Sequence, residues 1–176
     1  MPVEIPTLET ERLRLRGHRP DDLDACAAIW AHPAVVRYTT GKPQPREEVW
    51  WRILRYIGGW ALLGYGFWAV EEKSTGTFIG EIGFGNFKRD LDPPFGNAPE
   101  IGWILDPRFH GKGYGTEAAR AVIAWGDEHF GLARTVCLIQ PENQASLRIA
   151  AKCGYVEYGR TKYREHAVIM LAREPS

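Results

Sequence analysis

Hydrophobic and polar positions along the chain switch between a repeat of two and a repeat of three to four residues. Alternating Arg and Leu over residues 12–16 predict a half-buried strand. Apolar side chains three and four positions apart predict a helix that begins near Pro20 and a longer helix over about residues 46–63. The longer helix is expected to end near Gly64 and Gly66.

The rest of the chain predicts shorter elements. Strands are expected over residues 67–72, 78–87, 100–105, 135–139, 156–160 and 167–171, and helices over about residues 116–130 and 143–152. The polar turn 73–76 joins the first two of these strands as a hairpin, and residues 89–99 form a loop rich in Pro, Asp and Gly. We therefore expect one mixed α/β domain over residues 1–176, with helices packed on a largely antiparallel sheet.

Composition and charge narrow the classes of partner. Lys and Arg number 22, and Asp and Glu also number 22, so no basic excess favours nucleic acid or an anionic membrane. The sequence shows neither a signal core nor an apolar run near the ~18 residues of a membrane span, which predicts a cytoplasmic protein. The three cysteines lie apart in apolar segments and are expected to be buried thiols, and a chain of this size needs no metal or disulfide to fold.

The stretch FHGKGYGTEAAR, residues 109–120, places three glycines at alternate positions before a helix-forming sequence. Glycines let a backbone approach a phosphate closely, and a helix start presents unpaired N–H groups at the positive end of its dipole. Lys112 and Arg108 add positive charge nearby. The stretch therefore predicts a diphosphate site, while a turn that only starts a helix remains a second interpretation.

Two other phosphate motifs fit this stretch less well. A Walker loop requires Ser or Thr after Gly-Lys, and Gly113 stands there. A dinucleotide fingerprint is matched by Gly113, Gly115 and Ala118, but its first glycine should follow the strand almost at once. Here residues 106–112 intervene, and the first elements of the chain are not βαβ units.

Three stretches carry a resemblance to a known family: LETERLRLR near the start, EIGWILDPRFHGKGYGTEAARAVIAWG in the middle and NQASLRIAAKCGY later. The chain resembles the GNAT superfamily of N-acetyltransferases, in the branch of the Rim-type ribosomal-protein N-terminal acetyltransferases. The resemblance covers nearly the whole chain. It implies the GNAT fold, in which a central, mostly antiparallel twisted sheet is splayed between two strands and flanked by helices.

The resemblance also implies acetyl-CoA as the acetyl donor and no metal. Its diphosphate is expected on the loop backbone, and its pantetheine arm along the strand edge at Trp103, Ile104 and Leu105, residues that also have a simple packing interpretation. The expected loop contacts are His110, Gly111, Lys112, Gly113, Tyr114, Gly115 and Thr116. The family has Gln or Arg where His110 stands, so we expect weaker side-chain support there and a loop histidine, not a catalytic one.

Acetyl transfer to an amine requires that the amine lose a proton. At pH 7 this costs about 4.6 kcal/mol for a lysine side chain with a pKa near 10.4, and about 1 kcal/mol for an α-amine near 7.8. Glu100, which begins the expected pantetheine strand, is the first candidate base, and the family resemblance supports an acid at this position. Glu81, among small and apolar residues, is the second, and water the third.

The thiolate that leaves after acetyl transfer can take a proton from a nearby side chain. Relatives often carry a Tyr seven residues after the Asn that corresponds to Asn143, and Ala150 stands there. Ser146 matches a hydroxyl found in the ribosomal-protein branch and could serve instead, with Asn143 touching pantetheine. Alternatively, Ser146 is an ordinary first-turn serine and Asn143 the helix cap.

The acceptor is expected to be a primary amine, either a protein N-terminal α-amine or a small molecule. Four aromatic residues, Trp50, Trp51, Tyr56 and Trp60, lie on the long helix, and Trp51 is off its apolar face. The loop 89–99 is expected to overhang the same cleft. A non-catalytic acyl-CoA-binding or sensing domain of the same fold is the alternative function, and a homodimer remains open.

Overall fold

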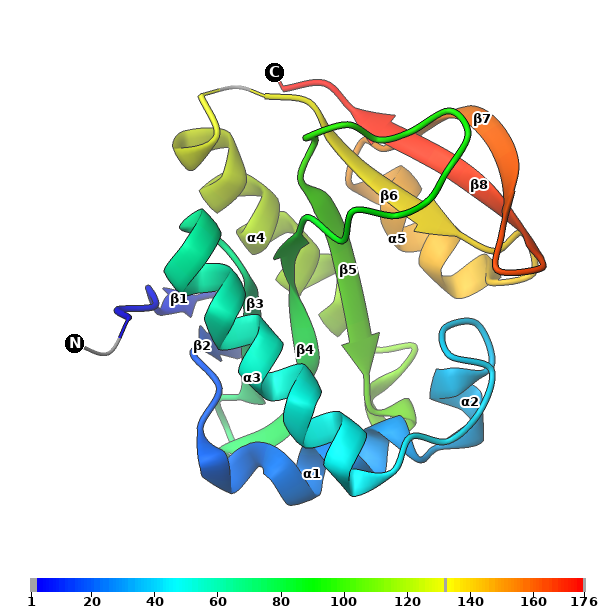
Figure 1. Cartoon of the computed structure of the whole chain (residues 1–176). Coiled ribbons are helices and arrows are strands. Elements are labelled where there is room, and N and C mark those ends of the chain that lie inside the picture. The colour runs from blue at the N-terminus through cyan, green and yellow to red at the C-terminus, as the bar shows by residue number, and fades with distance from the viewer. Residues whose placement is uncertain (1–2, 132, 176) are drawn as a thin grey trace.

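A single eight-stranded sheet organises the chain, with the strand order β1-β2-β3-β4-β5-β6-β8-β7. The computed structural model, shown in Figure 1, describes residues 3–131 and 133–175. The strands are β1 (Leu8–Glu9), β2 (Leu13–Arg16), β3 (Phe67–Glu72), β4 (Thr77–Gly85), β5 (Glu100–Leu105), β6 (Thr135–Ile139), β7 (Val156–Tyr163) and β8 (His166–Arg173). Neighbouring strands are antiparallel except for the parallel pair β5 and β6, which makes the sheet mostly antiparallel as expected.

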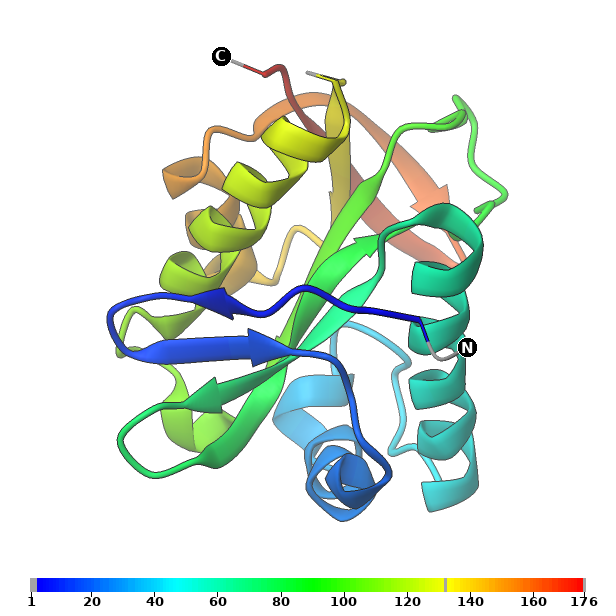
Figure 2. The same cartoon turned by 90° about the vertical axis from the view of Figure 1, so that its left-hand side faces the viewer.

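Helices cover both faces of the sheet (Figure 2). The helices are α1 (Leu23–Trp30), α2 (Pro33–Val36), α3 (Arg46–Leu63), α4 (Tyr114–His129) and α5 (Gln144–Lys152), with short 3-10 turns at Pro20–Asp22 and Pro107–Phe109. One face carries α1 and α3, and the other carries α4 and α5.

The alternation of side chains along β4 divides the two faces. Ile82 and Phe84 are almost fully buried in the main core, which includes Val122 of α4. Glu81, one position earlier, points to the opposite face and contacts side chains of α1 and α3. This period-two pattern is the usual consequence of a pleated strand. It leaves one acidic side chain buried on the face of α1 and α3.

Strand β5 separates from β6 along most of its length. All six residues of β5 pair with β4, from Glu100 opposite Gly85 to Leu105 opposite Gly80. Its pairing with β6 consists of Glu100 opposite Val136, beside a bond from the Val136 N–H to the Pro99 carbonyl of 3.0 Å. The two strands therefore part toward Leu105. The splay that the family resemblance implies is confirmed.

The observed elements follow the sequence pattern closely. The long helix α3 has the predicted bounds, and the expected strands over 67–72, 100–105 and 135–139 are found as predicted. Two short elements, β1 and α2, were not predicted. Among the residues that the structure describes, no helix is both long and apolar enough to cross a bilayer.

Candidate active site

The glycine stretch forms the entrance to α4. Gly111 and Gly113 have φ values of 73° and 81°, in the left-handed region that favours glycine. Gly113 is the N-cap residue, and residues 111–113 are exposed. Within the described chain, no hydrogen bond outside the helices and strands uses a backbone N–H of residues 111–116 as donor. The loop thus presents a group of N–H donors at the positive end of the helix dipole.

Arg12, the residue just before β2, holds this loop in place. Its Nη1 donates to the Lys112 carbonyl at 2.8 Å, and its Nε donates to Glu117 Oε2 at 2.7 Å. The Arg12 N–H and the Thr10 hydroxyl also donate to Glu117 Oε1, at 2.8 and 2.6 Å. Sequence analysis missed this role, since LETERLRLR indicated only a strand. The guanidinium also lies 4.2 Å from the centre of the Tyr114 ring.

The side chains flanking the loop have internal partners. His110 is exposed and its Nε2 donates to the Leu105 carbonyl at 2.9 Å, which links the loop to the end of β5. Arg108 forms an ion pair of 2.7 Å with Asp106, and its hydrogen bond lowers the pKa of that carboxyl. Tyr114 is buried, and its hydroxyl donates a hydrogen bond to Glu72 Oε1. The backbone of the loop is therefore better placed than these side chains to contact a diphosphate.

The open edge of β5 faces α5 across the splay. Trp103 Nε1 donates to Ser146 Oγ at 3.1 Å, and Asn143 Oδ1 accepts from the Ser146 N–H at 3.2 Å. Asn143 is therefore the N-cap of α5. Trp103 and Leu105 pack against the main core, while Ile104 packs against the cluster beneath α1 and α3. The structure thus brings together Trp103, Ser146 and Asn143, whereas Ile104 faces the other side of the sheet.

Glu100 lies at the closed end of the splay, and its residue is 5% exposed. Arg89 forms a bidentate ion pair with the Glu100 carboxylate. Its Nε donates to Oε2 at 2.8 Å and its Nη2 donates to Oε1 at 2.9 Å. Burial raises the pKa of Glu100, the Arg89 charge opposes this effect, and the pKa remains above its ordinary value. Arg89 lies between Phe87 and Tyr163, at 4.8 and 5.0 Å from the ring centres. Sequence analysis did not identify Arg89, because nothing in the loop sequence indicates its partner.

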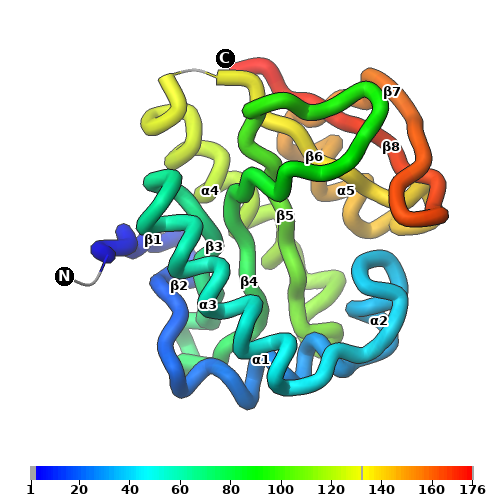
Figure 3. The backbone as a smooth tube through the Cα atoms, viewed as in Figure 1, coloured from blue at the N-terminus to red at the C-terminus, as the bar shows by residue number. Residues whose placement is uncertain are grey.

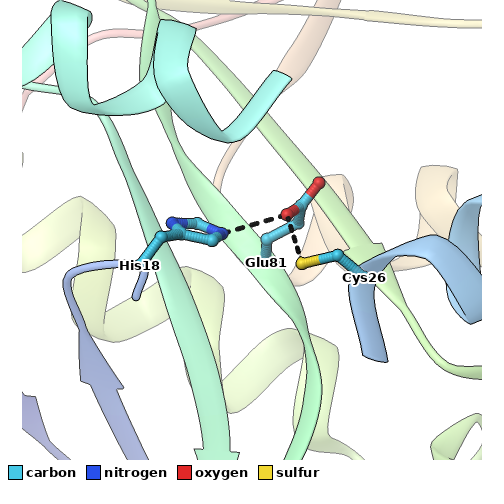
Figure 4. A group of neighbouring side chains, drawn as sticks. All are labelled: His18, Cys26 and Glu81. Atoms are coloured by element: carbon cyan, nitrogen blue, oxygen red, sulfur yellow. Dashed lines mark hydrogen bonds and ion pairs between the residues drawn. The ribbon is translucent and has the colours of Figure 1, made fainter. Parts of the chain in front are cut away.

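Glu81, the second candidate base, is enclosed by donors and 2% exposed. Figure 4 shows its carboxylate between His18 and Cys26, with His18 Nε2 at 3.0 Å and Cys26 Sγ at 3.8 Å from Oε2. Trp30 Nε1 and the Tyr56 hydroxyl donate to Oε1 at 2.7 and 2.8 Å. Burial raises the pKa of Glu81, but the hydrogen bonds and the charge of His18 outweigh it and lower the pKa. This geometry favours a structural role that joins β4 to α1 and α3.

A cavity of about 220 Å³ lies under the connection between β4 and β5. Its lining includes Phe87, Lys88, Arg89, Phe95 and Glu100. The aromatic side chains of α3 behave as their helical spacing predicts: two of them, Tyr56 and Trp60, are 8% and 4% exposed, whereas Trp51 is 54% exposed. Trp51 is therefore the exposed aromatic residue among these three, and it does not line the cavity.

Comparison with known proteins identifies the class. A family model described as an acetyltransferase (GNAT) domain matches residues 12–156. YkkB of Bacillus subtilis (strain 168) is 33% identical over 158 residues, which are 88% of this chain and 87% of that protein. A structure from Bordetella pertussis, described as a GNAT-family acetyltransferase, has a TM-score of 0.85 at 28% identity and covers 96% of this chain and 99% of that chain.

The chain therefore belongs to the GNAT acetyltransferase family and is an acetyl-CoA-dependent N-acetyltransferase. Family membership favours an enzyme over the non-catalytic alternative. A structure of the ribosomal L7/L12 α-N-protein acetyltransferase RimL in complex with coenzyme A has a TM-score of 0.78. It is 19% identical and covers 97% of this chain and 98% of that one, which shows a shared fold.

Proposed function

We propose that this chain acetylates a primary amine, either a small molecule or a protein α-amine, with the donor diphosphate held by the backbone of residues 111–116. The observation that carries the proposal is the group of exposed N–H donors at Gly111, Gly113 and the start of α4, beside an unpaired strand edge. Charge-assisted hydrogen bonds of this kind contribute about 1.5–3 kcal/mol each. The site therefore fits a diphosphate without requiring a metal.

The edge of β5 provides the second part of the donor site. Residues 101–104 pair with β4 on one side only, so their outward N–H and C=O groups are available to an extended ligand with amide groups. The Asn143 bond to Ser146 uses Oδ1, which leaves the Asn143 side-chain amide able to donate. Bound acetyl-CoA would supply an activated thioester carbonyl for transfer.

The residues at the closed end of the splay provide the proton chemistry. We assign Glu100 as the base that takes the amine proton, since burial moves its pKa toward neutrality. Arg89 acts as a positioning residue, because it fixes both carboxylate oxygens. Ser146 accepts from Trp103, so its own hydroxyl proton is available to the thiolate.

The unpaired, buried thiols of Cys26, Cys137 and Cys153 suit the reducing cytoplasm as the place of action.

Release of free CoA in the presence of amines tests this function. Purified protein is incubated with acetyl-CoA and, in turn, amino acids, N-terminal peptides, polyamines and amino sugars, and thiol release is followed. We expect amine-dependent release with at least one class. Tight binding of CoA without release for every amine would contradict the catalytic proposal and favour a sensing domain.

A further inference from the structure

The connection between β4 and β5 encloses a space for a small polar ligand. The cavity measures about 220 Å³, which corresponds to about seven water molecules at ~30 Å³ each. The connection is held against the β7–β8 hairpin, beside which it runs in Figure 3, by a bond of 2.8 Å from the Thr161 hydroxyl to the Asp92 carbonyl. The volume leaves room for an acceptor of amino-acid size.

Two residues that line this cavity, Arg89 and Glu100, form an ion pair. Glu100 has 7% and Arg89 has 24% of its side chain exposed. The three hydrogen bonds between them use Nε and Nη2 of Arg89, so Nη1 takes no part in them. A ligand that reaches the pair meets a carboxylate that attracts an ammonium and a guanidinium nitrogen that attracts a carboxylate.

The remaining lining adds positive charge and apolar surface. Lys88 and Arg89 line the cavity together with one acidic residue, Glu100, and the exposed Lys88 ammonium donates to Asn97 Oδ1 at 3.3 Å. A polyamine or amino sugar would add further cations beside Lys88 and Arg89, which disfavours it electrostatically. Phe87, Pro94 and Phe95 also line the cavity and offer apolar contacts.

We propose that this cavity selects a free α-amino acid with an apolar side chain as the acetyl acceptor. Its carboxylate contacts Arg89 Nη1 and Lys88, its amine lies toward Glu100, and its side chain packs against Phe87 and Phe95. The inference rests on the proposed function and names the substrate class for that same site. Glu100 begins β5, the strand whose unpaired edge is proposed to hold the pantetheine arm, and its pairing with Val136 closes the splay.

The reaction then balances without a further reagent. The amine nitrogen forms a bond to the acetyl carbonyl carbon as the bond between that carbon and the CoA sulfur breaks. Glu100 takes the proton that the amine loses, and the sulfur leaves as a thiolate that is protonated by Ser146 or water. The products are an N-acetyl amino acid and free CoA thiol.

A matched series of acceptors tests the inference on the unmodified protein. Thiol release is measured with L-phenylalanine, L-phenylalaninamide and phenethylamine, which share an aromatic body and differ in the carboxylate, and with leucine, spermidine, an amino sugar and an N-terminal peptide. We expect kcat/KM for phenylalanine or leucine to exceed that for the amide and the decarboxylated amine at least tenfold. Equal rates for acid and amide, or a preference for spermidine, the amino sugar or the peptide, would overturn the inference.

A pair of charge variants localises the effect. Lys88→Gln removes a cation from the cavity and is expected to reduce the preference for acid over amide several-fold. Lys162→Gln makes the same change on the exposed hairpin, where Lys162 contacts Glu165, and is expected to leave the preference unchanged. An unchanged preference in Lys88→Gln would contradict the assigned carboxylate site. Release that is as fast or faster with amines that lack a carboxylate would overturn only this inference, whereas no release with any amine would overturn the proposed function itself.

Discussion

The indole nitrogen of Trp103 donates a hydrogen bond of 3.1 Å to the hydroxyl of Ser146, across the gap where β5 and β6 separate. This bond joins residues 43 positions apart in the chain. Because the hydroxyl accepts from Trp103, its own proton is directed elsewhere. The Asn143 cap fixes the backbone of Ser146 in the same place. The serine is thus oriented by two independent contacts.

Ser146→Ala is expected to lower kcat modestly, by up to about tenfold. The reason is that a thiol pKa near 8.5 lets the thiolate leave largely unaided. Trp103→Phe removes the indole N–H that donates to Ser146 but keeps an aromatic ring. It is expected to lower kcat by a similar factor. Steady-state kinetics at saturating acetyl-CoA measure both. If both variants turn over at the normal rate, Ser146 is an ordinary first-turn serine.

Glu100→Gln is expected to lower kcat by about 10²–10⁴-fold, the usual contribution of a general base. The loss should be greatest at pH values where the acceptor amine is protonated, and smaller above the pKa of that amine. CoA affinity should stay near normal, which isothermal titration can establish. Equal rates for variant and wild type across the pH range would exclude Glu100 as the base.

Arg89→Gln provides a separate test of how Glu100 is tuned. Since burial raises the pKa of Glu100 and Arg89 opposes it, wild-type activity should fall as pH drops through a pKa above the ordinary 4.5. Loss of the Arg89 charge should raise that pKa further and move the acid limb of the kcat profile to higher pH. A limb that does not move would show that Glu100 does not set it.

Arg12→Ala is expected to weaken CoA binding about tenfold, because it frees the Lys112 carbonyl and leaves Glu117 without its cation. Arg14→Ala is the matched control. Arg14 lies two residues further along, in β2, is more exposed and pairs with Glu9. Calorimetric titration with CoA compares the two. Equal affinity in Arg12→Ala and Arg14→Ala would show that the bonds to Arg12 do not order the loop for binding.

Glu81→Gln is expected to lower the free energy of unfolding by about 1.5–3 kcal/mol, since a buried charge that accepts several donors is lost. The lowered pKa of Glu81 stabilises the fold above the pKa of the unfolded chain, and this contribution is lost as pH falls through the folded pKa. Urea unfolding at several pH values should therefore show a weaker acid dependence in the variant than in wild type. The exposed Glu47→Gln serves as control. A stable variant without turnover would instead indicate that Glu81 is the base.

Local patterns predicted the elements and the loop, but not the contacts between distant residues. The bounds of α3 follow from Pro45 before it and Gly64 after it. The alternating leucines of β2 indicate a strand because side chains in a strand alternate between the two faces. Elements of two and four residues, such as β1 and α2, are too short to show a period. The roles of Arg12 and Arg89 depend on strand register and loop path, since Arg12 meets Glu117 105 residues away.

The central claim is that backbone N–H groups at the entrance of α4 hold the donor diphosphate, and CoA titration of two Gly113 variants tests it most directly. Both Gly113→Ala and Gly113→Asp put a side chain at a φ of 81°, where Asp is no more strained than Ala, and only Asp adds a negative charge. We predict that Asp raises the Kd for CoA at least about a hundredfold above the Ala value. The reason is that the carboxylate of the Asp variant would repel the negatively charged diphosphate of CoA. Equal Kd values for the two variants would contradict the account.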